Sequence, residues 1–133
     1  MASLESAIRA MLLTGTSLST AGIADDRVTH GYRLQNSVLP ALTYGADETS
    51  LLTIGANSLR RARAEVRVVA ETTAAALAFV PVISAICNAG TYDTIDFQSV
   101  LFEGHAVEPA AAGDGDENQP AELVCWVEII YED

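Results

Sequence analysis

Four of the seven basic residues in the sequence lie within eight consecutive positions, in the stretch RRARAEVR at 60–67. They are Arg60, Arg61, Arg63 and Arg67, called the arginine row below; the other basic residues are also arginines, and the sequence contains no lysine. A guanidinium group is planar and donates paired hydrogen bonds to carboxylates or phosphates, whereas lysine acts as a solvated point charge. The arginine row therefore predicts paired recognition of an anionic group.

Three kinds of anionic partner stay open for the arginine row. Glutamates of a neighbouring strand, such as Glu122 or Glu128, would make the row a solvated strand face in which each cross-strand pair contributes a few tenths of a kcal/mol. Acidic residues of another copy or of a partner protein would make it a subunit contact. DNA phosphates are the third, although Glu65 interrupts the row and no aromatic residues interleave with it for base stacking.

The remaining polar motifs predict neither catalysis nor a metal site. The stretch DGDEN at 114–118 resembles the start of a calcium loop, but Gln119 and Cys125 occupy positions that require glycine and glutamate, so we expect an exposed hairpin loop there. His30 and His105 stand alone, without a neighbouring G-x-S-x-G turn or a metal-ligand spacing. A P-loop is excluded because it needs a lysine. We therefore expect no enzyme activity, no cofactor and no metal.

The two cysteines and the N-terminus bear on the compartment. Cys87 and Cys125 lie in apolar surroundings, which predicts reduced cysteines in a core rather than a disulfide. At the N-terminus, Glu5 precedes Arg9, and Arg9 splits the apolar stretch, which is atypical of a signal peptide. No apolar run reaches the roughly 18 residues of a membrane span. We expect a protein that is made and kept in a cytoplasm and has no membrane partner.

The periodicity of apolar residues predicts two helices and five strands. Alternation is clearest at 60–70, and the alanine-rich run behind it has helical spacing, with Thr72 or Thr73 as the N-cap. Pro81 should kink this second helix or start its second half. In order, we expect a helix over 3–13 capped by Ser3, a loop over 14–26, strands over 27–34, 41–46 and 60–70, a helix that stops at Asn88, and strands over 95–109 and 121–133.

Runs of strands with two helices predict an α+β fold, as one domain over residues 1–133. We expect an antiparallel β-sheet of about four to five strands with two α-helices packed on one face. The formal net charge is −11, so the chain should repel nucleic acid except where its arginines gather. An acidic surface with one arginine row is typical of self-complementary assembly.

Five segments, in order along nearly the whole chain, resemble the small tail-terminator (tail-completion) proteins of long-tailed bacteriophages. They are LESAIRAMLL, DDRVTHGYRL, VLPALTYG, the strand-to-helix unit AEVRVVAETTAAALAF, and the closing CWVEIIYED. The resemblance implies a non-enzymatic virion protein that forms a ring, usually hexameric, on the last ring of the tail tube. Such a ring stops tube growth and presents a surface to the neck, so the implied partners are other copies, the tail tube protein and a neck or head-closure protein.

The resemblance turns the arginine row into a hypothesis about subunit contacts. A ring closes by joining two different surfaces of one chain, and the arginine row and the acidic loop with Asp114, Asp116 and Glu117 have opposite charge. We expect these residues to form the interface, and we expect genomic DNA to pass through an acidic or neutral bore without specific binding. Two alternatives stay open: a head-closure or neck adaptor protein, and a small cytoplasmic ligand-binding α+β domain.

Overall fold

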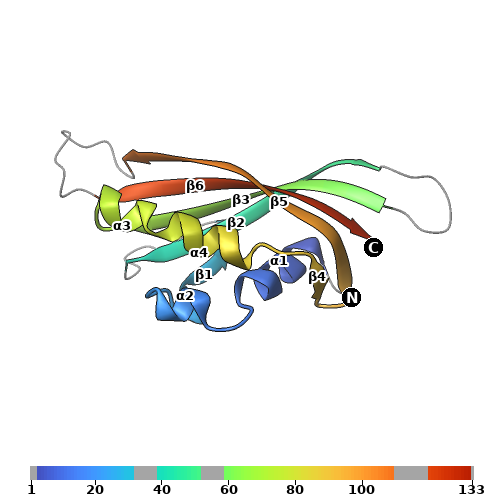
Figure 1. Ribbon diagram of the computed structural model, residues 1–133, viewed down its shortest axis with the longest axis horizontal. Coiled ribbons are helices and arrows are strands. Elements are labelled where there is room, and N and C mark those ends of the chain that lie inside the picture. Colours follow the sequence, from blue (N-terminus) through green and yellow to red (C-terminus); the bar gives the residue numbers. More distant parts are fainter. Residues whose placement is uncertain (1–2, 32–38, 52–58, 110–119, 133) are drawn as a thin grey trace.

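The computed structural model describes residues 3–31, 39–51, 59–109 and 120–132 (Figure 1). The helical elements are α1 (Leu4–Leu12), α2 (Ser17–Thr20), the 3-10 turn η1 (Asp25–Arg27), α3 (Thr73–Leu77) and α4 (Phe79–Ile86). The strands are β1 (Val28–His30), β2 (Ala41–Leu51), β3 (Leu59–Ala70), β4 (Gly90–Tyr92), β5 (Ile95–Pro109) and β6 (Ala121–Glu132).

Within these ranges the six strands form one sheet in the order β1-β2-β3-β6-β5-β4. Neighbours pair antiparallel throughout, except that β1 runs parallel to β2. The predicted α+β class is confirmed, but the sheet is mixed and has one strand more than expected. The missed strand is β4, whose three residues are too short to show alternation in the sequence.

β3 lies at the centre of the sheet because it pairs along its length with β2 and β6. Its alternating sequence gives it two different faces. Ala62, Ala64, Val66 and Val68 are fully buried on the side of the core, and the charged residues between them point the other way. The predicted strand over 60–70 is confirmed, with Leu59 added at its start.

The helices α1 and α4 pack on the same face of the sheet, as predicted (Figure 1). Ile8 and Met11 of α1 and Ile83 of α4 are fully buried there, against the inward-facing residues of the central strands. The hydroxyl of Ser3 accepts the backbone N–H of Ser6, which caps α1 as expected. Burial of these large aliphatic side chains is the main source of stability for helices of this length.

The second predicted helix is divided in two at Ala78. The hydroxyl of Thr72 accepts the backbone N–H of Ala75 at 3.1 Å and so caps α3. Pro81 lies in the first turn of α4. Backbone N–H groups in the first turn have no partner within the helix, so the N–H that proline lacks costs no helical hydrogen bond there. Of the two alternatives predicted for Pro81, a kink or the start of a second half, the structure agrees with the second, since α4 begins at Phe79, two residues before Pro81. α4 ends at Ile86, two residues before Asn88.

Three boundaries differ from the sequence-based expectation. The predicted loop over 14–26 contains α2 and the start of η1. The buried side chains of Leu18 and Ile23 anchor these short helical turns, whereas the many Ser, Thr and Gly residues around them favour a loop in the sequence. The predicted strand over 27–34 is a strand only over Val28–His30; residues 32–34 lie outside the described residues. β2 continues past residue 46 to Leu51, paired with β3.

Candidate assembly interface on the open sheet face

The outward side chains of β2, β3, β6 and β5 form a face that none of the described helices covers (Figure 1). We call it the open sheet face. Strand alternation and the pairing register determine its composition. Its charged and large apolar members include Asp47, Arg61, Arg63, Glu65, Arg67, Leu101, Glu103, Glu108, Glu122, Trp126, Glu128 and Ile130.

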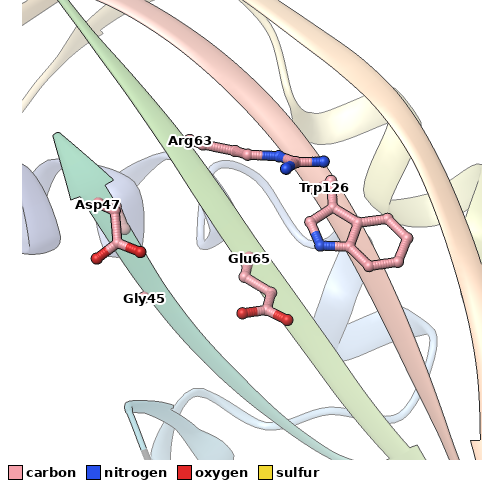
Figure 2. Close-up of a pocket in the computed structure, with 6 residues that line it drawn as sticks. Gly45, Asp47, Arg63, Glu65 and Trp126 are labelled. Atoms are coloured by element: carbon pink, nitrogen blue, oxygen red, sulfur yellow. The ribbon is translucent and has the colours of Figure 1, made fainter. Parts of the chain in front are cut away.

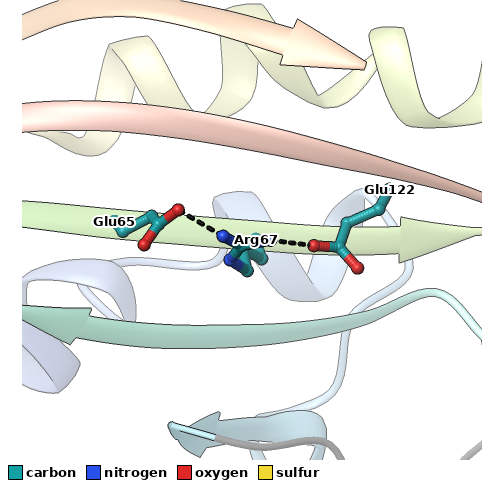
Figure 3. Close-up of polar contacts among 3 residues, drawn as sticks. All are labelled: Glu65, Arg67 and Glu122. Atoms are coloured by element: carbon teal, nitrogen blue, oxygen red, sulfur yellow. Dashed lines mark hydrogen bonds and ion pairs between the residues drawn. The ribbon is translucent and has the colours of Figure 1, made fainter. Parts of the chain in front are cut away.

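Three arginines of the arginine row lie on the open sheet face and pair with glutamates of the same chain. Arg61 Nε lies 3.9 Å from Glu128 Oε2. Arg63 Nε lies 3.4 Å from Oε1 of Glu103 on β5. Arg67 contacts both Glu122 and Glu65 (Figure 3). The first of the three alternatives, in-chain partners such as Glu122 and Glu128, is thus present, and Glu103 is an additional partner.

Arg67 is the most constrained of these arginines. It is opposite Val124 on β6, so Glu122 is its diagonal neighbour, and Glu65 lies two residues earlier on the same face of β3. The hydrogen bond that Glu122 accepts raises the pKa of Arg67, partly offset by desolvation and reinforced by the charge of Glu65. The guanidinium therefore stays charged and is shared between two carboxylates.

Arg63 extends across β6 instead of along β3. Its Cζ atom lies 5.7 Å from the ring centroid of Trp126, within the range of a cation–π contact. Its side chain is 55% exposed, the largest fraction among the three paired arginines. Arg63 is consequently the arginine of the open sheet face that solvent or another protein reaches most easily.

A hollow of about 290 Å³ lies on the open sheet face beside Trp126 (Figure 2). It exists because Gly45 has no side chain: a Cβ built there would meet no atom within 4 Å. Pairing places Gly45 opposite Glu65, and Glu65 opposite Trp126. The hollow is lined by Gly45, Ala46, Asp47, Arg63, Glu65 and Trp126.

The other predicted interface residues are not brought to this face. Arg60 alternates with Arg61, so it lies on the helix side of the sheet, opposite Tyr131. The arginine row is therefore split, with three members on the open sheet face and one behind it. Asp114, Asp116 and Glu117 lie outside the described residues.

The two cysteines and the two histidines lie outside the hollow. Cys87 and Cys125 are buried free thiols, and desolvation raises the pKa of Cys87 to about 12 and that of Cys125 to about 11, so both stay protonated at neutral pH. His30 and His105 are exposed, and the ring of His30 lies 5.5 Å from that of Tyr44. Within the described ranges no group of three His, Cys, Asp or Glu residues is placed to hold a metal ion.

No helix in the described parts of the chain is long and apolar enough to cross a membrane.

Sequence reasoning missed three of the residues that shape this surface. Gly45 looks like an ordinary strand residue in the sequence, and its effect depends on the neighbours that pairing gives it. Trp126 belongs to an alternating strand, and nothing in the sequence indicates its contact with Arg63. Glu103 reaches Arg63 at an irregular position of β5, where the register with β6 shifts between Phe102 and Gly104.

No protein-family model and no curated protein matches the sequence. The fold, in contrast, has counterparts among solved structures, where 17 chains match. One is a chain of the virion of a native gene transfer agent (GTA) particle, with a TM-score of 0.74 and 10% sequence identity. The match covers 98% of this chain and 95% of that chain. At this identity the likeness shows a shared fold over almost the full length of both chains.

Proposed function

We propose that this protein is a structural component of a virion and acts at the head-proximal end of a phage tail tube. In this role it forms a ring that stops tube growth and joins the tail to the neck. The observation that carries the proposal is the likeness, over 98% of the chain, to a chain of a gene transfer agent virion. The order of the segments that resemble tail terminators supports the same role.

A ring requires two different surfaces on each copy, and the sheet offers two different edges. Within the described residues, β1 covers β2 only at Leu42–Tyr44, and β4 covers β5 only at Ile95–Phe97. The rest of both outer edges has backbone groups directed away from the sheet. Two unlike edges at opposite ends of one sheet suit head-to-tail contacts between copies better than a two-fold dimer.

We further propose that the arginine row contributes to the contact between copies through Asp114, Asp116 and Glu117 of the neighbour. Arg67 is shared between two glutamates, so Arg61 and Arg63 are better placed for this contact. Arg61 pairs with Glu128 and Arg63 with Glu103, and their side chains are 43% and 55% exposed. An exposed ion pair contributes little to folding, so its arginine can exchange partners on assembly.

The charge of the chain fits passage of DNA without binding. Six copies at −11 each carry a formal charge of −66. Because the arginines of the open sheet face are paired with glutamates, this face adds no excess positive charge to a bore. Repulsion of phosphates would act over about 8 Å at physiological salt.

Light scattering of the purified protein, with and without isolated tail tubes, tests the proposal. We expect a ring-sized particle in solution or on addition of tubes, and binding at one end of each tube. Binding to portals in place of tubes would favour the head-closure or neck adaptor role. A monomer that binds neither would refute both virion roles.

A further inference from the structure

We propose that the hollow at Gly45 receives a cationic side chain, an arginine or a lysine, presented by a different protein. The inference deepens the proposed function, on which it rests for the setting of that partner in a virion. In this arrangement, the charge of the basic side chain pairs with Asp47 and Glu65, and its aliphatic stem packs against Trp126.

The walls of the hollow have the chemistry for such a guest. The carboxylates of Asp47 and Glu65 come from adjacent strands on either side of the space that Gly45 leaves (Figure 2). Within the described residues, the carboxylate of Asp47 has no ion pair or hydrogen bond, and the carboxylate of Glu65 pairs with Arg67 alone. Trp126 adds an aromatic wall, which favours a long aliphatic stem ending in a charge.

Among the described residues, Arg63 is the one cation that lines the hollow, and its position limits its repulsion of a guest. Its guanidinium points toward Trp126 and away from Asp47 (Figure 2). Its charge is offset by Glu103, with Nε and Oε1 3.4 Å apart. The acidic side of the hollow, between Asp47 and Glu65, is therefore left for an external cation.

The charges of this chain indicate that the cation comes from another protein. The sequence has no lysine, and six of its seven arginines are described. Each of the six has an interaction within the chain: with backbone carbonyls for Arg9 and Arg27, with glutamates on the open sheet face, and a further contact for Arg60. In the proposed ring, Arg61 and Arg63 meet the acidic loop of the neighbouring copy, so they are not available to the hollow. A basic segment of a different protein is therefore the complementary guest.

The chain provides its own reporter and a matched pair of variants. Trp126 is the single tryptophan and lines the hollow, so all tryptophan fluorescence comes from this wall. Gly45→Val fills the hollow without changing the charge, and its Cβ would meet no atom within 4 Å. Gly104→Val is the control: Gly104 is opposite Trp126 on β5, has equally open space and does not line the hollow. Valine is favoured in strands, so both variants should fold.

The probe is a short acetylated glycine-arginine-glycine amide, compared with the same peptide containing citrulline, which has a similar shape but no charge. We expect the arginine peptide to change Trp126 fluorescence saturably, with binding at least about tenfold weaker for citrulline and for Gly45→Val. Gly104→Val should bind as the unmodified protein does. Asp47→Asn, which alters no described contact, should weaken binding in the same direction.

Equal responses to the arginine and citrulline peptides, or unchanged binding by Gly45→Val and Asp47→Asn, would overturn the inference. Light scattering of the same samples separates it from the proposed function. Normal rings with no peptide binding would contradict the hollow as a cation site but would not contradict the proposed ring. Loss of self-association in Gly45→Val would instead identify a second copy as the occupant and overturn the choice of partner.

Discussion

The guanidinium of Arg63 lies over the indole ring of Trp126, with 5.7 Å between Cζ and the ring centroid. The two residues are diagonal neighbours on adjacent strands, two positions apart in the register, because Arg63 is opposite Glu128 and Trp126 is opposite Glu65. This contact directs the arginine toward Glu103 of β5 and holds the indole as one wall of the hollow. The most exposed paired arginine and the candidate docking site are thus parts of one arrangement.

Charge reversal at Arg63 tests the proposed contact between copies. We expect Arg63→Glu to abolish rings, because like charges brought together at an interface cost several kcal/mol per contact. The fold should persist, since the lost cation–π contact and exposed ion pair are each worth at most about 1 kcal/mol. Light scattering measures the rings and thermal unfolding measures the fold.

A compensating change makes the same test specific. If Arg63 meets the acidic loop of a neighbour, adding Asp114→Arg and Asp116→Arg to Arg63→Glu should restore rings. Intact rings in the single variant would rule out the pairing, and failure of the rescue would place the contact of Arg63 elsewhere.

The turn between β4 and β5 is conformationally unfavourable for its sequence. Asp93 and Thr94 connect the paired residues Tyr92 and Ile95, with φ angles of 48° and 70°. A β-branched residue is strained at positive φ, whereas a two-residue hairpin loop of this kind favours Asp-Gly. We expect Thr94→Gly to raise the free energy of unfolding by about 0.5–1 kcal/mol.

Urea unfolding measures this gain, and Thr91→Gly is the control because Thr91 is a strand residue of β4 without positive φ. The control should lose stability while Thr94→Gly gains it. A loss in both variants would show that the backbone at Thr94 is not strained.

Two adjacent threonines at the start of α3 allow a test of which one caps the helix. Thr72 accepts the backbone N–H of Ala75, and Thr73 is the first helical residue with an exposed side chain. Thr72→Ala should therefore cost about 1 kcal/mol of unfolding free energy, and Thr73→Ala close to nothing. Equal costs in thermal unfolding would contradict the assignment of the cap.

Alkaline pH should destabilise the protein through its buried thiols. Burial raises the pKa of Cys87 from its ordinary 9.0 to about 12, so the folded state holds the proton more tightly than the unfolded state does. The free energy of unfolding is then unaffected below pH 9.0 and decreases as the pH rises from there toward about 12.

Removing the thiol should flatten this decrease. We expect Cys87→Ala to show a smaller drop in urea stability between neutral pH and about pH 10.5 than the unmodified protein, whatever its stability at neutral pH. Tyr92 is present in both proteins, and its pKa is raised by burial and further by the charge of Cys87. Removing Cys87 therefore also reduces the shift at Tyr92, which flattens the profile in the same direction. Parallel pH profiles would show that Cys87 does not titrate differently in the folded state.

The long elements could be predicted from the sequence because single segments specify them. β3 and β6 alternate over many residues, and α1 has an apolar stripe with Ser3 as a cap. β4 could not be predicted in this way, because its three residues form a strand only by pairing with β5 across a tight turn. The parallel pairing of β1 with β2 is likewise a tertiary result without a local signal.

The candidate site was predictable only in part. Alternation predicts that Arg61, Arg63 and Arg67 share a face, and the charge of β6 suggests Glu122 and Glu128 as partners. The hollow depends on register, which brings Gly45, Glu65 and Trp126 of three strands into one row. The sequence has no local signal for that row.

The central claim is a ring of this protein at the head-proximal end of a tail, and immunogold electron microscopy of native particles tests it most directly. The account predicts label at the junction of tail and head, in every particle. Label along the tube, at the distal tip or on no particle at all would contradict it.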